Sequence, residues 1–513
     1  MSTMGWIFVA FLLYLGMMIL VGVKDMKKQN NTSDYFLGGR KLNGWVAAFS
    51  AQASDMSGWL LMGLPGAVYA FGTGQLWIAV GLFIGTVLNW LFVATRLRRY
   101  TIRANDSITL PRYFENRFHD DTRVLLLVSS IAILIFFLVY TASALASGGK
   151  LFTTVFGLDY HVSLTIGAAV ILIYTLLGGF DAVCDTDFIQ GTIMVIALVS
   201  VPLAAIAVTG DLSSAVSAKL AGTNDYFLNP MYDNGSKITA VSIISQLAWG
   251  LGYCGMPHII VRFMAVKSEK ELNKAKLVGI VWDIISLIFA ILIGVVGRAY
   301  IAGDLTATGD QEKVFIKMII QLFTQDRNLP VIGGLFLCGI LAAIMSTADS
   351  QLLITASSVT EDIYMGFFRK TPGDEKAIRI SRVTVLCVAA ASYFIAWNPN
   401  SSIMGLVSDA WAGLGASFGP TVLLSLYWKR TNRQGAAAGI AAGAITVIFW
   451  DYIACFGGKT AAEATGLYSL AVGFAVSMAA IVIVSLLTPA PGKEIEAEFD
   501  DISHAMDIES AKS

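Results

Sequence analysis

Long apolar segments alternate with short polar connections along almost the whole chain. A helix that crosses a bilayer needs about 20 mostly apolar residues, and the chain holds many such runs. The pattern predicts an all-α polytopic membrane protein. We expect about thirteen transmembrane helices, near residues 5–23, 43–70, 75–95, 123–148, 162–180, 186–208, 239–260, 277–300, 331–357, 381–397, 403–427, 435–453 and 466–487.

The composition agrees with a membrane protein. Of 513 residues, 56% are hydrophobic and 14% are charged, whereas soluble domains carry about 25% charged residues. This excludes an ordinary soluble multidomain enzyme, a disordered scaffold and a fibrous protein. The net charge of −1 gives no general attraction to nucleic acid. The five cysteines and four histidines are scattered along the chain, so we expect no disulfide framework, no transition-metal site and no cofactor.

Positive charges concentrate in alternate connections between the predicted helices. Positive residues favour the cytoplasmic side of a membrane, so the N-terminus is predicted outside and the C-terminus inside. The connections that then face the cytoplasm hold 27 of the 35 Lys and Arg residues. They are 24–42, 96–123, 262–276, 358–382, 428–434 and the tail after 488.

The first apolar run is predicted to stay in the mature protein, because no basic segment precedes it as in a cleaved signal peptide. We therefore expect a single transmembrane domain over residues 1–487, in the inner (plasma) membrane of the cell and surrounded by its lipid bilayer. Residues 488–513 are acidic and polar and are predicted to form a cytoplasmic tail.

The second predicted helix contains groups that are costly in a bilayer. Its segment Ser54-Asp55-Met56-Ser57-Gly58 places a carboxylate and two hydroxyls where an apolar helix is expected. A kinked helix with locally satisfied polar groups would also explain the composition. A helix broken near Asp55–Gly58 explains it better, because freed carbonyls and hydroxyls could ligate a hard cation.

The seventh predicted helix is interrupted in a similar way, at Trp249-Gly-Leu-Gly-Tyr253-Cys-Gly-Met-Pro257-His258. Its glycines spell G-x-G-x-x-G, but no strand precedes them, so dinucleotide binding is rejected. Two interrupted helices five spans apart indicate an inverted-repeat transporter with its site between them. We expect 5+5 repeats over residues 43–208 and 239–427.

The ninth predicted helix carries small residues and hydroxyls on one face. Ala343, Ser346, Thr347 and Ser350 share this face at helical spacing. Close packing of two helices explains such a stripe about as well as ion binding does. Opposite a broken helix that bears Asp55, a cation site is the favoured interpretation.

Longer motifs resemble the sodium/solute symporter family, in particular its bacterial sodium/proline symporters. The resemblance spans roughly residues 5–487, which is essentially the whole predicted membrane region. The motifs are Tyr35-Phe-Leu-Gly-Gly-Arg40, Ser54 to Gly66, Trp249 to Ile259, Arg262-Phe-Met-Ala265, Leu341-Ala-Ala-x-Met-Ser-Thr347 and Ala410-Trp-Ala-Gly-x-Gly-Ala416. The resemblance implies a leucine-transporter-like core and alternating access. It also implies L-proline as substrate, sodium as coupling ion, no enzymatic activity and no obligate protein partner.

The resemblance also implies individual roles. Sodium ligands or neighbours would be Ala53, Asp55, Met56, Ala343, Ser346 and Thr347. Substrate contacts would be Ser57, Trp59, Gly63, Tyr140, Trp249, Tyr253 and Pro257. Arg40 and Asp187 match positions on the inner part of the ion path.

The chain departs from the family pattern at Asp181, Asp185, Asp283 and Asp409, where an apolar or aromatic residue is usual; Asp349 fits the wider family. The nearest alternative function keeps the fold and changes the solute to another amino acid, pantothenate or a monocarboxylate. A transporter-like sensor would need an appended signalling domain, for which the tail is too short. A channel is disfavoured by two broken helices, and an enzyme by the lack of a catalytic constellation.

Overall fold

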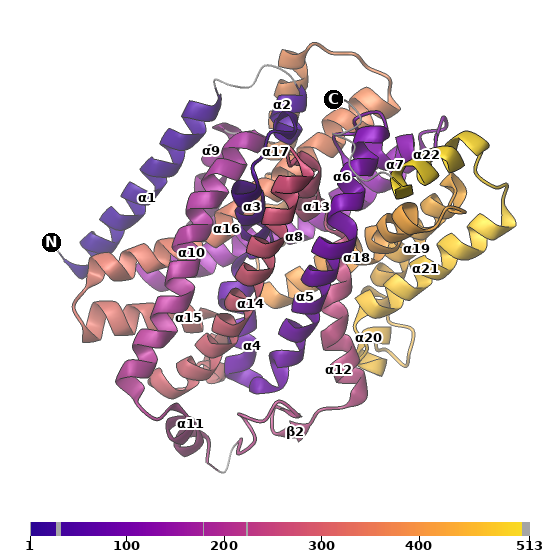
Figure 1. Ribbon diagram of the computed structural model, residues 1–513. Coiled ribbons are helices and arrows are strands. Elements are labelled where there is room, and N and C mark those ends of the chain that lie inside the picture. Colours follow the sequence, from indigo (N-terminus) through magenta and orange to yellow (C-terminus); the bar gives the residue numbers. More distant parts are fainter. Residues whose placement is uncertain (1, 27–31, 178, 222–223, 505–513) are drawn as a thin grey trace.

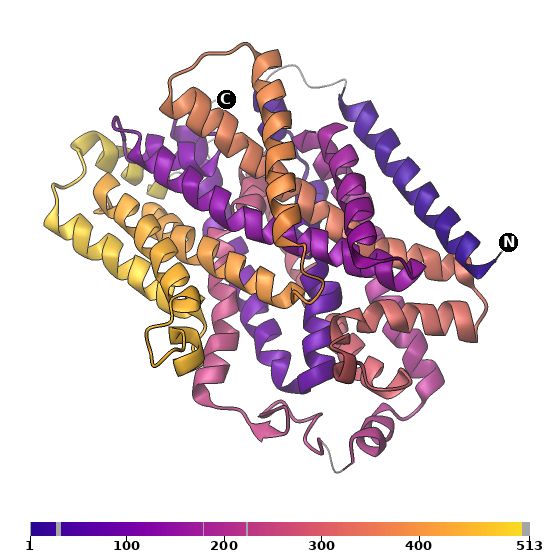
Figure 2. The same cartoon turned by 180° about the vertical axis from the view of Figure 1, so that it is seen from behind.

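The computed structural model describes residues 2–26, 32–177, 179–221 and 224–504. These residues form one bundle of helices and a single short hairpin (Figures 1 and 2). One end of the bundle carries α2, α7 and α22, and is here named the α22 end. The opposite end carries α11 and the hairpin, and is named the α11 end.

The described part of the chain before the hairpin consists of helices and their connections. Its helices are α1 (Thr3–Met26), α2 (Thr32–Leu37), α3 (Gly44–Asp55), α4 (Leu64–Phe71), α5 (Leu76–Leu88), α6 (Ala94–Arg103), α7 (Leu110–Arg117), α8 (Val124–Phe156), α9 (Tyr160–Leu177), α10 (Phe180–Thr209) and α11 (Leu212–Leu220).

The second half starts with an antiparallel hairpin and is helical from there on. It comprises β1 (Tyr232–Asp233), β2 (Ser236–Lys237), α12 (Ala240–Leu247), α13 (Pro257–Ala265), α14 (Glu269–Tyr300), α15 (Val314–Ile319), α16 (Pro330–Ser357), α17 (Asp374–Ile395), α18 (Ile403–Tyr427), α19 (Arg433–Tyr452), α20 (Ala461–Thr465), α21 (Ser469–Leu487) and α22 (Lys493–His504).

The predicted break in the second helix is present. Asn43 caps the start of α3 by accepting a hydrogen bond from the Val46 amide at 3.0 Å, and α3 ends at Asp55. Met56 leaves helical geometry, with ψ of 74°. Wide helical turns over Trp59–Gly63 then lead into α4. Gly58 allows this route, because a Cβ there would lie 2.3 Å from the Ser147 hydroxyl of α8.

The second predicted break is present as well. After α12 the chain makes tight turns over Ala248–Gly255, becomes extended at Met256, and starts α13 with Pro257 in its first turn. Gly252 and Gly255 are required here, since a Cβ on either would lie within 3 Å of α18. Pro257 has no amide hydrogen to lose at a helix start.

The two broken helices run antiparallel beside each other at the α22 end. Leu42, just before α3, accepts a hydrogen bond from the Lys267 amide at 3.0 Å. Its own amide donates to the Ala265 carbonyl at 3.2 Å. The start of α3 is thereby joined to the end of α13, and the two helices pack together. This arrangement is expected of inverted repeats.

The all-α membrane fold with broken helices is confirmed. Within the described residues, nine helical segments are long and apolar enough to cross a bilayer. The most buried of them is Pro330–Phe367, in which 83% of the most apolar stretch is buried inside the protein. The number of spans, thirteen, and the repeat boundaries stay predictions. Of the predicted tail, residues up to 504 include α22, and 505–513 lie outside the described residues.

Candidate functional site

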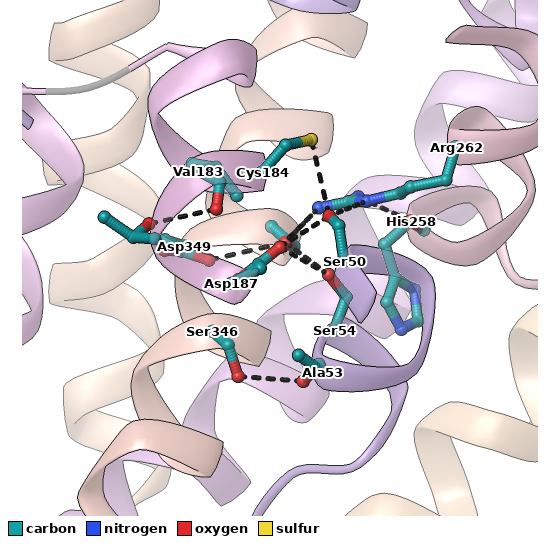
Figure 3. Close-up of polar contacts among 12 residues, drawn as sticks. Ser50, Ala53, Ser54, Val183, Cys184, Asp187, His258, Arg262, Ser346 and Asp349 are labelled. Atoms are coloured by element: carbon teal, nitrogen blue, oxygen red, sulfur yellow. Dashed lines mark hydrogen bonds and ion pairs between the residues drawn. The ribbon is translucent and has the colours of Figure 1, made fainter. Parts of the chain in front are cut away.

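The hydroxyls of α16 meet the carbonyls at the break in α3. Ser346 Oγ lies 2.8 Å from the Ala53 carbonyl oxygen, and Thr347 Oγ1 lies 3.3 Å from it. Both hydroxyls also lie 3.2 Å from the Ala343 carbonyl oxygen. Figure 3 shows Ser346 directed at Ala53. Each hydroxyl has one proton but two lone pairs, so four oxygens converge with capacity left for a hard cation.

Asp55 is fully buried at the end of α3 but pairs with a different element. Its Oδ2 accepts a hydrogen bond of 2.7 Å from the Tyr253 hydroxyl, which lies in the break of the second broken helix. Its backbone carbonyl accepts one of 2.9 Å from Trp59 Nε1. The structure therefore places the Asp55 side chain between the two broken helices, with Tyr253, while Ala53 contacts Ser346 and Thr347.

Aromatic rings from two elements pack next to these breaks. Trp249 and Tyr253 both contact Trp411 of α18, at ring centroid distances of 6.5 and 5.1 Å. Trp411 Nε1 donates to the Trp249 carbonyl at 2.8 Å. Trp411 was not among the residues to which the sequence assigned a role, although it lies in a quoted motif. Its signal was Gly252, whose missing Cβ leaves room for the Trp411 indole.

The remaining predicted substrate contacts surround the same region. Tyr140 of α8 is fully buried, and its ring lies 5.7 Å from that of His258. Ser57 lies in the break after α3 and its hydroxyl accepts from the Trp59 amide at 3.3 Å. Gly63 ends the wide turns before α4, where it packs against Met404, and Pro257 starts α13.

A buried ion pair lies on the α22 side of the break. Asp187 Oδ2 accepts hydrogen bonds from Ser50 at 2.6 Å and Ser54 at 3.3 Å, and lies 3.5 Å from Arg262 (Figure 3). The guanidinium also donates to Ser350 Oγ at 2.5 Å. The sequence placed Arg262 in a polar connection. That placement is wrong, because Arg262 is 1% exposed within α13.

Arg40 lies apart from Asp187, at the α22 end. Its guanidinium donates to Asp106 Oδ1 at 2.7 Å, to the Met264 carbonyl at 2.6 Å and to the Ser107 carbonyl at 2.9 Å. The structure thus brings Arg40 to the end of α13, whereas Asp187 meets the middle of that helix. The two predicted path residues flank α13 at different points.

A second ion pair joins three elements at the α11 end. Lys150 of α8 donates to Glu312 Oε2 at 2.6 Å and to the Ser401 carbonyl at 2.7 Å. Glu312 Oε1 in turn accepts from the Ser402 hydroxyl and the Met404 amide at the start of α18. This cluster joins α8, the turn before α15 and the start of α18, and sequence reasoning did not identify it.

The other unusual carboxylates have separate surroundings. Asp409 of α18 accepts from the Tyr452 hydroxyl at 2.5 Å. Asp349 is buried on α16 beside Ser350. Asp185 is exposed, and Asp181 lies against the turn at Gly38.

Comparisons with known proteins give one answer. The model of the sodium:solute symporter family matches residues 35–443. The high-affinity proline transporter PutP of Bacillus subtilis is 46% identical over 490 residues, which are 95% of this chain and 100% of that protein. A sodium/proline symporter of Staphylococcus aureus is 43% identical over 509 residues, 96% of this chain and 95% of that one.

Among solved structures, a Na⁺-coupled sialic acid symporter in a substrate-bound, outward-open state has the same fold. Its TM-score is 0.76, its sequence identity is 21%, and the match covers 95% of this chain and 99% of that one. This similarity shows the fold of the chain over nearly its whole length.

Proposed function

Because this chain belongs to the sodium:solute symporter family, we propose that it couples inward movement of sodium to uptake of L-proline by alternating access. The substrate rests on the proline transporters to which the chain is 43–46% identical over nearly its full length. The observation that carries the mechanism is the meeting of the Ser346 and Thr347 hydroxyls with the Ala53 carbonyl at the break in α3.

The coupling ion is assigned to this meeting point. Its ligands are the carbonyls of Ala53, Met56 and Ala343 and the hydroxyls of Ser346 and Thr347. Asp55 lies two residues from Ala53 and contributes negative charge at the end of α3. Oxygen ligands of this kind suit a hard cation. No further cofactor is needed for a carrier of this type.

The substrate is assigned to the aromatic region between the breaks. Trp59, Tyr140, Trp249 and Tyr253 form an apolar wall suited to a pyrrolidine ring, with Ser57, Gly63 and Pro257 on the backbone around it. Because α3 bears both the ion ligands and Ser57, sodium binding orders the segment that contacts proline. By linkage, proline then raises sodium affinity by the same factor.

Transport follows from opening the two ends in turn. The cluster of Lys150 and Glu312 separates the site from the α11 end, and the contacts of Arg40 separate it from the α22 end. We assign the α22 end to the cytoplasm, because most Lys and Arg residues lie in the connections there. The membrane potential then adds about 2.3 kcal/mol per 100 mV for each positive charge moved inward.

The two halves of the transporter are assigned to residues 43–208 and 239–427. Each half begins with a broken helix, and α3 and α13 pack antiparallel as inverted repeats require. In this arrangement the ion site lies between the first helix of one repeat and α16 of the other. Rocking of one repeat against the other therefore changes the ion site directly.

Uptake of radiolabelled L-proline into proteoliposomes tests the proposal, with an inward sodium gradient compared with a matched potassium gradient. Thr347→Val removes one sodium ligand while keeping its shape. Loss of one charge-assisted contact of about 1.5–3 kcal/mol predicts a ten- to hundredfold lower sodium affinity. Thr355→Val is the matched control, because Thr355 is buried two turns further along α16 and its hydroxyl donates to the Gln351 carbonyl at 2.6 Å, away from the ion site.

Two outcomes contradict the proposal. Equal uptake in sodium and potassium removes sodium coupling, and unchanged sodium affinity in Thr347→Val removes the ion site. Sodium-driven uptake of another small solute without uptake of proline keeps the carrier and changes its substrate.

A further inference from the structure

A fully buried carboxylate on α14 forms no hydrogen bond of usual distance and angle in the described part of the chain. Asp283 is 0% exposed, and both of its oxygens lack such a bond. The polar side chains nearest to its carboxylate are Thr86 of α5 and Gln52 of α3, which lie within loose hydrogen-bonding reach, and the nearest charged group is Asp55. No Lys or Arg is among them. An isolated buried carboxylate is costly unless a positive charge reaches it.

Further oxygens without such a bond lie in the same place. In the described part of the chain, Asp55 Oδ1 and Thr86 Oγ1 are both buried and form no hydrogen bond of usual distance and angle. Together with the two oxygens of Asp283, they make four buried oxygens that lack such a bond. The Tyr253 hydroxyl lies near Asp283 and Thr86, and it donates a hydrogen bond of 2.7 Å to the other oxygen of Asp55.

The surrounding helices fix these groups relative to one another. The Gln52 side-chain amide donates to the Gly279 carbonyl at 2.9 Å, one turn before Asp283. Trp282 Nε1 lies 3.0 Å from the Met56 sulfur. The helix α14 packs against both α3 and α5, and α5 packs against the segment Ala248–Gly255. The position of Asp283 opposite Asp55 is therefore part of the packed core.

We propose that Asp55, Asp283 and Thr86 form a second sodium site, between α3, α5 and α14 and separate from the oxygens of α16. Carboxylate and hydroxyl oxygens are ligands for hard cations, and Ca²⁺ takes six to eight of them. Four oxygens suit a monovalent ion better. The described residues contain no group of three or more His, Cys, Asp or Glu that could hold a metal ion, and the proposed site has two carboxylates and one hydroxyl.

In this proposal, the Asp55 carboxylate is a direct ligand of the second sodium ion. Ala53 and Asp55 lie at the same end of α3, so an ion at either site stabilises the same break. The second ion also bridges α3 to α14. This step rests on the proposed function, since it makes the second ion a further coupling ion of the same carrier. The sodium dependence of uptake should then have a Hill coefficient near two.

The number of bound sodium ions tests the inference directly. Equilibrium binding of ²²Na⁺ is measured on the purified full-length protein without proline, so that no substrate amine can occupy the carboxylates. The parent protein is expected to bind two ions per chain. Asp283→Asn, which keeps the side-chain shape, and Thr347→Val are each expected to bind one. Asp409→Asn is the matched control, because it removes a different helix carboxylate, and is expected to bind two.

The outcomes separate the two proposals. One ion in the parent, kept in Asp283→Asn and lost in Thr347→Val, overturns the second site and leaves the proposed function intact. No sodium bound to the parent overturns both. A fall in the Hill coefficient of uptake from near two to near one in Asp283→Asn supports the second site and shows that the variant is folded. Displacement of both ions by Ca²⁺ at equal concentration overturns the assignment to sodium.

Discussion

Asp187 and Asp283 are both fully buried carboxylates on long apolar helices, yet their surroundings differ. Asp187 has Arg262, Ser50 and Ser54 around one oxygen. Asp283 forms no hydrogen bond of usual distance and angle in the described residues and faces a second carboxylate, Asp55. A buried charge with its own counter-charge can be held without an ion, whereas one without it depends on a ligand. Arg262 thus stabilises the Asp187 carboxylate without a bound ion, whereas the Asp283 carboxylate is the one for which we propose a bound cation.

The largest expected effect comes from removing the counter-charge of Asp187. Arg262→Met leaves the carboxylate buried and unpaired, which costs about 3–5 kcal/mol of stability. Unfolding in mixed detergent micelles measures this loss. The double variant Arg262→Met with Asp187→Asn is the control and should recover most of the stability. A single variant as stable as the parent would show that Asp187 does not need Arg262.

The next effect concerns the stabilisation by sodium. Asp283→Asn should lose the contribution of one bound ion, about 2.7 kcal/mol at a sodium concentration one hundred times its dissociation constant. In potassium buffer the variant should be at least as stable as the parent, because an unpaired carboxylate has been removed. Unfolding curves in sodium and in potassium measure both quantities. The comparison fails if Asp283→Asn keeps the full sodium-dependent shift.

A smaller effect distinguishes the hydroxyls of the two clusters. Tyr253→Phe removes the hydrogen bond to Asp55, so the carboxylate is less well oriented. Sodium affinity without proline should fall about tenfold, or about 1.4 kcal/mol. Ser50→Ala removes a hydroxyl from Asp187, but Arg262 and Ser54 remain. Its sodium affinity should equal that of the parent, and equal losses in both variants would contradict the distinction.

The smallest effect is expected for an exposed carboxylate. Asp106 pairs with Arg40, but its side chain is 69% exposed, so water and salt screen the pair. Asp106→Asn should change stability by less than about 1 kcal/mol. Arg40 keeps the carbonyls of Met264 and Ser107. A loss comparable to that of Arg262→Met would show that exposure does not decide the difference.

The fold and the breaks in its helices could be predicted from the sequence, because both depend on local composition. Apolar length predicts a membrane helix, and Asp55 to Gly58 cannot continue one without cost. Helix ends were less accurate: α10 starts at Phe180, six residues before the predicted span. A helix can begin in polar residues that hydropathy assigns to a connection.

The partners of the site residues could not be predicted in the same way. Helical spacing shows which residues share a face, but it does not show which helix packs against that face. Arg262 resembled the basic residues of a connection until α13 placed it beside Asp187, 75 residues earlier in the chain. Asp283 had no assigned role for the same reason. Its neighbours Asp55 and Thr86 lie about 200 residues away and are brought close only by packing.

The backbone link between Leu42 and the residues around Val266 has a mechanical consequence. Two hydrogen bonds join the start of α3 to the end of α13, so we expect the two helices to move together as one rigid body. The helix α3 carries Asp55, which faces Asp283, and the helix α13 carries Arg262, which pairs with Asp187. A tilt of the two helices at the α22 end would therefore displace Asp55 and Arg262 together. An ion bound at Asp55 would oppose movement of α13 as well as of α3.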